Sequence, residues 1–213
     1  MHKPTRSRLI PSLILALLLS LFPRQVDARV GIDLPPLDEF IEQVTNGEAD
    51  VLRGVYMPGV LADPVFSQPE DDPAFVSSEE NTLTQFGLAS RFGSTGLLAH
   101  NYLAGKNFFL VEQGQVFYLI YGDGRVESFI ITGLMQFQAL QPDSVRSNFI
   151  DLDTGRTLSA SKLFTRVYNK PGRVILQTCI EANGNTSWGR FFVIAEPYDE
   201  SDSGSTFEPA SLE

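Results

Sequence analysis

Two side chains of this sequence are suited to nucleophilic chemistry, and both are rare in it. Cys179 is the only cysteine, and His2 and His100 are the only histidines. A cysteine reacts as its thiolate, and an ordinary thiol with a pKa of about 8.5 is mostly protonated at neutral pH without a base or an imidazolium beside it. His2 lies in a predicted signal peptide, so the mature chain offers Cys179 one partner, His100.

A third residue, Arg190, follows Cys179 by 11 positions. It begins a predicted strand, and Cys179 stands near the end of the preceding one. In an antiparallel hairpin the end of one strand lies beside the start of the next. A guanidinium at this place would reach the thiol and stabilise the negative charge that develops on a carbonyl oxygen during acyl transfer.

Each of the three residues also has a structural interpretation. Most free cysteines are small buried hydrophobic residues, and Cys179 is open to that reading. His100 would then be a satisfied strand-end histidine and Arg190 a surface salt-bridge partner. A single cysteine in an exported protein cannot form an internal disulfide, so the thiol is expected to be either buried or used.

The amino terminus has the pattern of a secretory signal. Lys3, Arg6 and Arg8 precede an apolar run of 14 residues, 9–22, and Ala28 lies in a suitable cleavage context. A stable membrane span needs about 18 to 20 apolar residues, which favours a signal peptide over residues 1–28. The protein is therefore expected to be exported to the periplasm, cell surface or medium, with membrane attachment only if this segment is retained.

Length and charge narrow the remaining possibilities. The 213 residues suit one domain with attachments. Cleavage after residue 28 removes four of 16 basic and one of 26 acidic residues, leaving a net charge of −13. Nucleic acid is therefore not an expected partner.

The elements that must position the trio are mostly strands. A linker with a short amphipathic helix, 37–46, is expected over residues 29–50, a β-rich catalytic domain over 51–197 and an acidic disordered tail over 198–213. The predicted strands are 54–60, 65–66, 96–99, 108–111, 116–121, 126–131, 173–180 and 190–195. Loops are predicted over 67–81 and, with nine residues, over 181–189, whereas 135–170 mixes turns and short helices.

Three segments together resemble sortases, the cysteine transpeptidases. Leu98-Ala99-His100-Asn101 is similar to the histidine element of that family. Val174-Ile175-Leu176-Gln177-Thr178-Cys179 resembles its cysteine strand, and Gly189-Arg190-Phe191-Phe192-Val193 its arginine strand. The resemblance covers about residues 52–196, and papain-like peptidases are disfavoured because they place the cysteine before the histidine.

The resemblance implies a mainly β fold, a closed β-barrel with short helices, and a Cys-His-Arg site without metal or cofactor. Cys179 would form a thioester with a peptide carrying a sorting-type motif, His100 would protonate the leaving amine, and Arg190 would stabilise the oxyanion. An amine acceptor would then resolve the thioester. Thr178, Asn101 and Trp188 are candidate substrate contacts.

Two other functions stay open at this point. The same site would serve a cysteine endopeptidase that only hydrolyses its substrate, or the barrel would bind peptides without catalysis. One further pattern, Asp151-x-Asp153, resembles the start of a calcium loop. Gly155 and Lys162 occupy positions where that loop needs ligands, so we interpret it as a turn.

Overall fold

Ten strands form one sheet in the computed structural model, which describes residues 33–199. The predicted signal peptide, and the predicted acidic tail from residue 200 onward, lie outside the described residues. The strands are β1 (Leu52–Met57), β2 (Leu61–Ser67), β3 (Leu83–Gln85), β4 (Thr95–Leu98), β5 (Val116–Tyr121), β6 (Val126–Ala139), β7 (Phe149–Asp151), β8 (Thr157–Leu158), β9 (Val174–Ala182) and β10 (Asn185–Pro197). The helices are α1 (Leu37–Val44), α2 (Gly87–Ser90), the 3-10 helix η1 (Ala104–Leu110) and α3 (Ala160–Tyr168).

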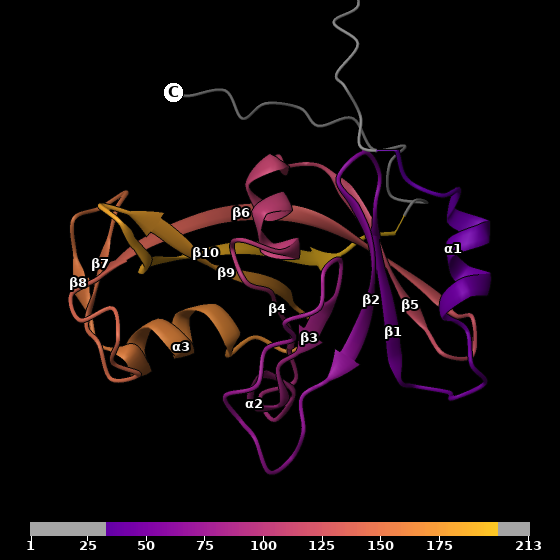
Figure 1. The fold of residues 1–213 in the computed structure, drawn as a ribbon, viewed down its shortest axis with the longest axis horizontal. Helices are drawn as coiled ribbons and strands as arrows, with labels where there is room; N and C mark the ends of the chain where they lie inside the picture. Colours follow the sequence, from indigo (N-terminus) through magenta and orange to yellow (C-terminus); the bar gives the residue numbers. More distant parts are fainter. Residues whose placement is uncertain (1–32, 200–213) are drawn as a thin grey trace, which may run out of the picture. The chain divides into compact units, whose positions relative to one another are not determined.

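The sheet closes into a barrel. Its order is β10-β9-β4-β3-β2-β1-β5-β6, and β6 pairs again with β10. Most neighbours are antiparallel, whereas β2 with β3 and β4 with β9 are parallel. In Figure 1 the long strands β6 and β10 run out of the barrel toward β7 and β8, with α3 beneath them. The predicted closed β-barrel with short helices is confirmed.

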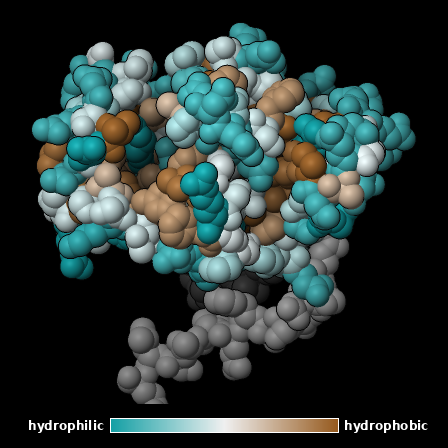
Figure 2. Space-filling model, turned by 90° about the horizontal axis from the view of Figure 1, so that it is seen from below, coloured by the Kyte–Doolittle hydropathy of each residue, from teal (hydrophilic) through white to brown (hydrophobic). Residues whose placement is uncertain are grey.

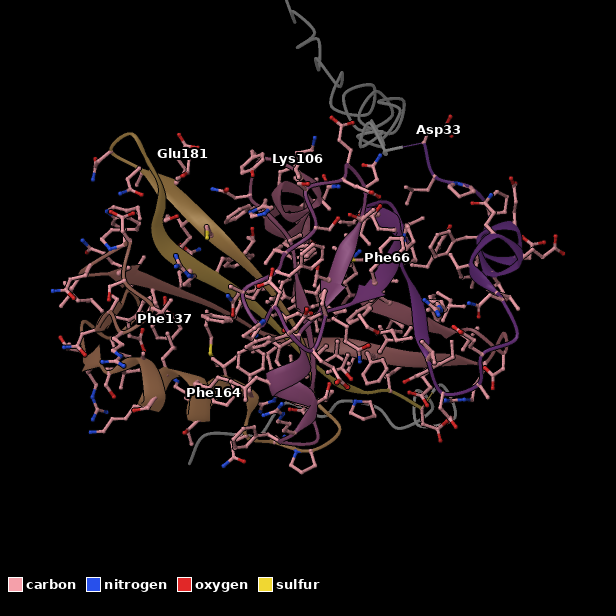
Figure 3. All side chains as sticks on the ribbon, turned by 60° about the horizontal axis from the view of Figure 1, so that its bottom comes forward. Asp33, Phe66, Lys106, Phe137, Phe164 and Glu181 are labelled. Carbon is pink, nitrogen blue, oxygen red and sulfur yellow. The ribbon has the colours of Figure 1, made fainter. Side chains whose placement is uncertain are left out.

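Strand alternation divides the apolar side chains into two cores. Along β9, Val174 and Leu176 point into the barrel, and Ile175 points to the opposite face, where it joins a second core beneath α3. Phe137 and Phe164 lie on this α3 side of the sheet, as Figure 3 shows. The outer face of β9 and β10 is therefore covered by this second core, to which α3 contributes Leu163, Val167 and Tyr168 and α2 contributes Ala89.

The helix predicted over residues 37–46 is confirmed as α1 and ends at Val44. Its buried Phe40 packs on the barrel at Gly54, where an added Cβ would lie 2.9 Å from the Phe40 ring. Just before the helix, the Pro35 carbonyl accepts a hydrogen bond of 3.0 Å from the Tyr56 hydroxyl. These contacts fix the linker on the outside of β1.

One predicted strand extends too far, and another is wrong. The strand over 54–60 is broken at Pro58-Gly59, where Gly59 has a φ of +70°, and the chain turns from β1 into β2. The run over 108–111 lies mostly in η1, and Phe108 is completely buried in the barrel core. A short apolar run has the same pattern whether it forms a strand or a buried helical turn.

The loop predicted over residues 181–189 is also wrong. β9 and β10 continue to a two-residue turn at Asn183-Gly184, whose φ angles of +53° and +75° are both in the left-handed region. Asn-Gly favours such hairpin turns because both residues tolerate positive φ. A register shift between Asn185 and Gly189 absorbs the remaining residues.

The segment over 135–170 consists of the extension of β6, then β7, β8 and α3. Among residues 33–199, no helix is long and apolar enough to cross a bilayer.

Candidate active site

Cys179 and Arg190 lie on the neighbouring strands β9 and β10, and His100 follows the end of β4, the other neighbour of β9. Cys179 and Arg190 are direct partners in the antiparallel register of β9 and β10. The parallel register of β4 and β9 pairs Leu98 with Gln177, and the Ala99 amide extends it by donating to the Gln177 carbonyl at 3.2 Å. Continued for two residues, this register would bring His100 to the level of Cys179. Cys179 and Arg190 share one face of the sheet on strands about 5 Å apart, and an extended chain after β4 would place His100 on that face too. We refer to these three residues as the row.

That face is the one covered by α3. Leu98, Gln177 and Phe192 stand two residues before or after the members of the row and share their face. They line a cavity of about 180 Å³ whose walls are mostly apolar: Phe86, Leu98, Val145, Phe149, Ala160, Leu163, Phe164, Tyr168, Gln177, Arg190 and Phe192. Of the three predicted catalytic residues, Arg190 lines this cavity, whereas His100 and Cys179 are not among its lining residues.

Arg190 carries a positive charge that no described residue neutralises. Its Nη1 donates to the carbonyls of Ser187 at 3.1 Å and Gly189 at 2.8 Å, which hold one side of the guanidinium at the start of β10. Within residues 33–199 it forms no salt bridge. The remaining donors are available to an oxygen beside Cys179, which is half-buried and therefore reachable.

The segment after β4 holds His100 by its backbone and its ring. The His100 carbonyl accepts hydrogen bonds of 3.0 Å from the amides of Leu103 and Gly105. The exposed ring of Tyr102 stacks on the imidazole, with centroids 5.1 Å apart and planes at 16°. Asn101 donates from its side chain to the Thr186 carbonyl at 3.1 Å, which ties this segment to the β9–β10 hairpin. The side-chain amide of Asn101 is therefore used in a hydrogen bond within the protein.

Thr178 points away from the row. It is 2 % exposed, and its hydroxyl donates to the Ala99 carbonyl at 2.9 Å. Gly105 leaves room for this junction, because a Cβ there would lie 2.7 Å from the His100 carbonyl oxygen. Thr178 therefore ties the cysteine strand to the residue before His100, and from this position it does not face the cavity.

Replacing Thr178 by valine is expected to destabilise the protein and misplace His100. The Ala99 carbonyl would lose its buried donor, which costs about 1 to 3 kcal/mol. Urea unfolding measures the loss, and the rate of Cys179 alkylation as a function of pH reports the imidazole's position. Thr178→Ser keeps the hydroxyl and should restore both, so a valine variant that matches the parent in both assays would contradict this role.

The floor of the cavity is held by a hydrogen bond between α3 and β9. The Tyr168 hydroxyl donates to Gln177 Oε1 at 2.6 Å. Burial raises the pKa of Tyr168, so the phenol stays protonated and keeps its donor. Gln177 is thereby fixed one pleat away from Cys179, with its side chain in the cavity wall.

Asp151, the last residue of β7, links α3 to the turn that follows β7. Its Oδ2 accepts from Arg166 of α3 at 2.7 Å, and its Oδ1 accepts from the amides of Asp153 and Thr154. Burial opposes ionisation, but these hydrogen bonds outweigh it and hold the pKa of Asp151 below its usual range. The Asp151-x-Asp153 pattern is therefore a turn, as predicted. No group of three His, Cys, Asp or Glu side chains within residues 33–199 is arranged to hold a metal ion.

Two differences separate this site from the predicted one. Trp188 is not among the residues that line the cavity. Gln177, Tyr168 and Phe164, which do line it, were not predicted as site residues. The alternation of β9 identifies Gln177 as a neighbour of Cys179 on the same face, whereas the α3 residues carry no motif and are found only by their packing.

No protein-family model matches the chain, and a search of curated proteins finds no match. Solved structures similar in shape include sortases, the family that the sequence motifs resemble. Sortase A from Listeria monocytogenes has 14% identity and a TM-score of 0.43, covering 70% of this chain and 88% of that one. Sortase C1 from Streptococcus suis has 14% identity and a TM-score of 0.48, covering 78% and 80%, and sortase A from Corynebacterium diphtheriae has 12% and 0.48, covering 78% and 70%. At these identities the likeness is one of fold alone.

Proposed function

We propose that the chain is a cysteine transpeptidase of the sortase type. The observation that supports the proposal is the pairing of Cys179 with Arg190 across β9 and β10, with His100 two residues beyond the end of β4, the other neighbour of β9. Acyl transfer needs a nucleophile, a proton carrier and a cation near the developing oxyanion, and these residue types supply one of each. The predicted signal peptide would deliver the domain outside the cytoplasm.

In the first step the Cys179 sulfur attacks a peptide carbonyl, and the carbon–sulfur bond forms as the carbon–nitrogen bond breaks. The proton of the thiol passes through His100 to the departing amine, which leaves neutral. In the second step an acceptor amine attacks the thioester, its proton returns through His100, and the free thiol is restored. Arg190 stabilises the carbonyl oxygen in both steps.

The cavity supplies the donor specificity. Its aromatic and aliphatic walls suit an apolar side chain, and its volume of about 180 Å³ suits one such residue of an extended peptide. The Gln177 side chain, held by Tyr168, lies beside the path of the peptide backbone. We infer that the substrate is an exported protein or peptide with an apolar residue shortly before the cleaved bond, and that the acceptor is an amine at the cell surface.

Mass spectrometry of the full chain tests the proposal. The chain is incubated with a pool of peptides in which one position is apolar and the others are varied, and an acyl adduct on Cys179 that hydroxylamine removes is the expected result. Cys179→Ala and His100→Ala should form no adduct, while Thr154→Ala, an exposed change in the turn that follows β7, should behave as the parent. Equal peptide processing by the parent and the two site variants would contradict the proposal.

The same experiment separates transfer from hydrolysis. With an added amine such as triglycine, a transpeptidase yields the amide-linked product, which is heavier than the free acid by a defined mass. Release of only the free acid at every amine concentration would assign the site to a cysteine endopeptidase. Binding without any covalent adduct would assign the barrel to peptide recognition.

A further inference from the structure

A second cavity, which we call the distal cavity, lies between α2 and the loop that follows β2, next to the first cavity. Its volume is about 420 Å³, and it is lined by Gln68, Pro69, Glu70, Pro73, Phe86, Gly87, Leu88 and Arg91. Phe86 also lines the first cavity, so one aromatic side chain forms the partition between the two. Figure 2 shows apolar surface and hollows interrupted by polar residues on this face.

One side chain, Gln68, connects the two walls of the distal cavity by hydrogen bonds. Gln68 Nε2 donates to the carbonyls of Pro73 at 3.0 Å and Phe75 at 2.9 Å, while its Oε1 accepts from the Gly87 amide at 3.2 Å. One amide group therefore joins the loop wall to the α2 wall. Both walls are held in place before any ligand arrives.

Phe86, which separates the two cavities, lies about four strand residues from Cys179 along the sheet. Two residues before Cys179 on β9 stands Gln177, which pairs with Leu98 of β4, and two residues before that stands Ile175, which pairs with Gly96. The Gly96 carbonyl accepts a hydrogen bond of 2.8 Å from the Phe86 amide. Four residues of strand span about 13 Å. An extended peptide acylated on Cys179 and running along these pairs thus reaches Phe86 with about its fourth residue, and longer peptides reach the distal cavity.

The chemistry of the distal walls indicates what would bind there. Leu88 is 42 % exposed, and with Phe86 and two prolines it offers an apolar surface. Arg91 is exposed, and among residues 33–199 it forms no salt bridge. An apolar side chain suits these walls, and an adjacent carboxylate would bind on the α2 side at Arg91, because the carboxyl group of Glu70 lines the opposite loop wall.

We propose that the distal cavity is a second subsite for the donor peptide, taking an apolar residue and an adjacent acidic residue that lie more than four positions on the amino-terminal side of the acylated residue. The inference rests on the proposed function for the position of the acyl group. The acyl side is the part of the donor that stays on the enzyme while leaving and acceptor amines exchange. Contacts made there act in both steps.

Binding to the Cys179→Ala full chain tests this without turnover. The probes are fluorescein-labelled peptides of the sequence Leu-Asp-Ser-Ala-Leu-Ala-Ser-Gly and, as the control, Gly-Ser-Ser-Ala-Leu-Ala-Ser-Gly. Fluorescence anisotropy should give a dissociation constant at least fivefold lower for the first peptide. Leu88→Lys and Arg91→Glu should each remove this preference, and Arg156→Glu, a charge reversal in an exposed turn, should keep it.

Turnover of the same peptides gives the second readout. In the parent chain kcat/KM should favour the Leu-Asp peptide by a similar factor, the Leu88 and Arg91 variants should lose that preference, and Arg156→Glu should keep it. Thermal unfolding checks that all variants fold. Equal affinity for the two peptides, absence of binding to either, or a preference that persists in both variants would overturn the subsite.

The two proposals fail in different ways. If the Leu-Asp preference in binding depends on Leu88 and Arg91 but no peptide forms an adduct on Cys179, the distal site stands and the transpeptidase does not. If adducts form and neither distal variant alters the preference, the transpeptidase stands alone. An effect produced only by residues on the carboxyl side of the cleaved bond would reverse the assigned direction and overturn the inference.

Discussion

Replacing Arg190 by lysine is expected to lower kcat/KM for peptide transfer by about 10²- to 10³-fold, the size of effect seen when one oxyanion donor is removed. The guanidinium uses Nη1 to bind two carbonyls and has further donors for the substrate oxygen. An ammonium keeps the charge but lacks the planar fork needed to do both at once. Steady-state kinetics with the peptide selected by Cys179 acylation measures the loss.

Two controls separate this role from a structural one. Arg156→Lys alters an exposed arginine in a turn outside the row and should leave kcat/KM unchanged. Alkylation of Cys179 by iodoacetamide needs no oxyanion donor, so its rate in Arg190→Lys should stay within about twofold of the parent. A lysine variant with parental kcat/KM would remove Arg190 from the site.

Replacing Asp63 by asparagine is expected to stabilise the protein at pH 8 by about 2 to 3 kcal/mol. Asp63 lies on β2, is 4 % exposed, and shares the inward face of that strand with Leu61 and Val65. Its Oδ2 has no hydrogen-bond partner among the described residues. Burial raises the pKa of Asp63 from 3.8 to about 6, because a carboxylate inside an apolar barrel is poorly solvated.

The raised pKa of Asp63 determines how the stability of the protein changes with pH. Near pH 4 the carboxyl is neutral in the folded chain and about half ionised in the unfolded chain, so the substitution should change stability by less than about 1 kcal/mol. As the pH rises from 4 to 6 the unfolded chain releases the proton more readily, so the parent loses stability, and above 6 the loss is complete. Asparagine cannot ionise and avoids the loss.

Urea unfolding of parent and Asp63→Asn at pH 4 and pH 8 measures both limits. Asp143→Asn, a change in the exposed loop after β6, should show no such difference between the two pH values. If the asparagine variant gained as much stability at pH 4 as at pH 8, the effect would come from packing and the titration of Asp63 would not explain it.

Most strands were predictable because they have strong local signals, whereas the closed barrel was expected only from the resemblance to sortases. Runs of β-branched and aromatic residues predicted β5, the start of β6, β9 and β10. The row was predictable in part. Rarity made Cys179 and His100 the only possible pair, and the short spacing to Arg190 indicated neighbouring strands.

The rest depended on contacts between distant residues. Nothing local distinguishes the Phe108 run in η1 from a strand, since its burial is decided by the open end of the barrel. The parallel register that aligns Leu98 with Gln177 joins segments far apart in the chain and has no local signature. For the same reason Tyr168 and Phe164, supplied by α3, could not be assigned to the cavity from the sequence.

The parallel pairing of β4 with β9 also has a consequence in time. The Thr178 hydroxyl and the Ala99 carbonyl, which clasp these strands, are 79 positions apart in the sequence. Contacts of such separation form late, because a long loop must close before any interaction rewards it. A chain still emerging or still extended therefore carries a thiol with no imidazole beside it. In the proposed site, the imidazole can reach the thiol only after β4 and β9 have paired.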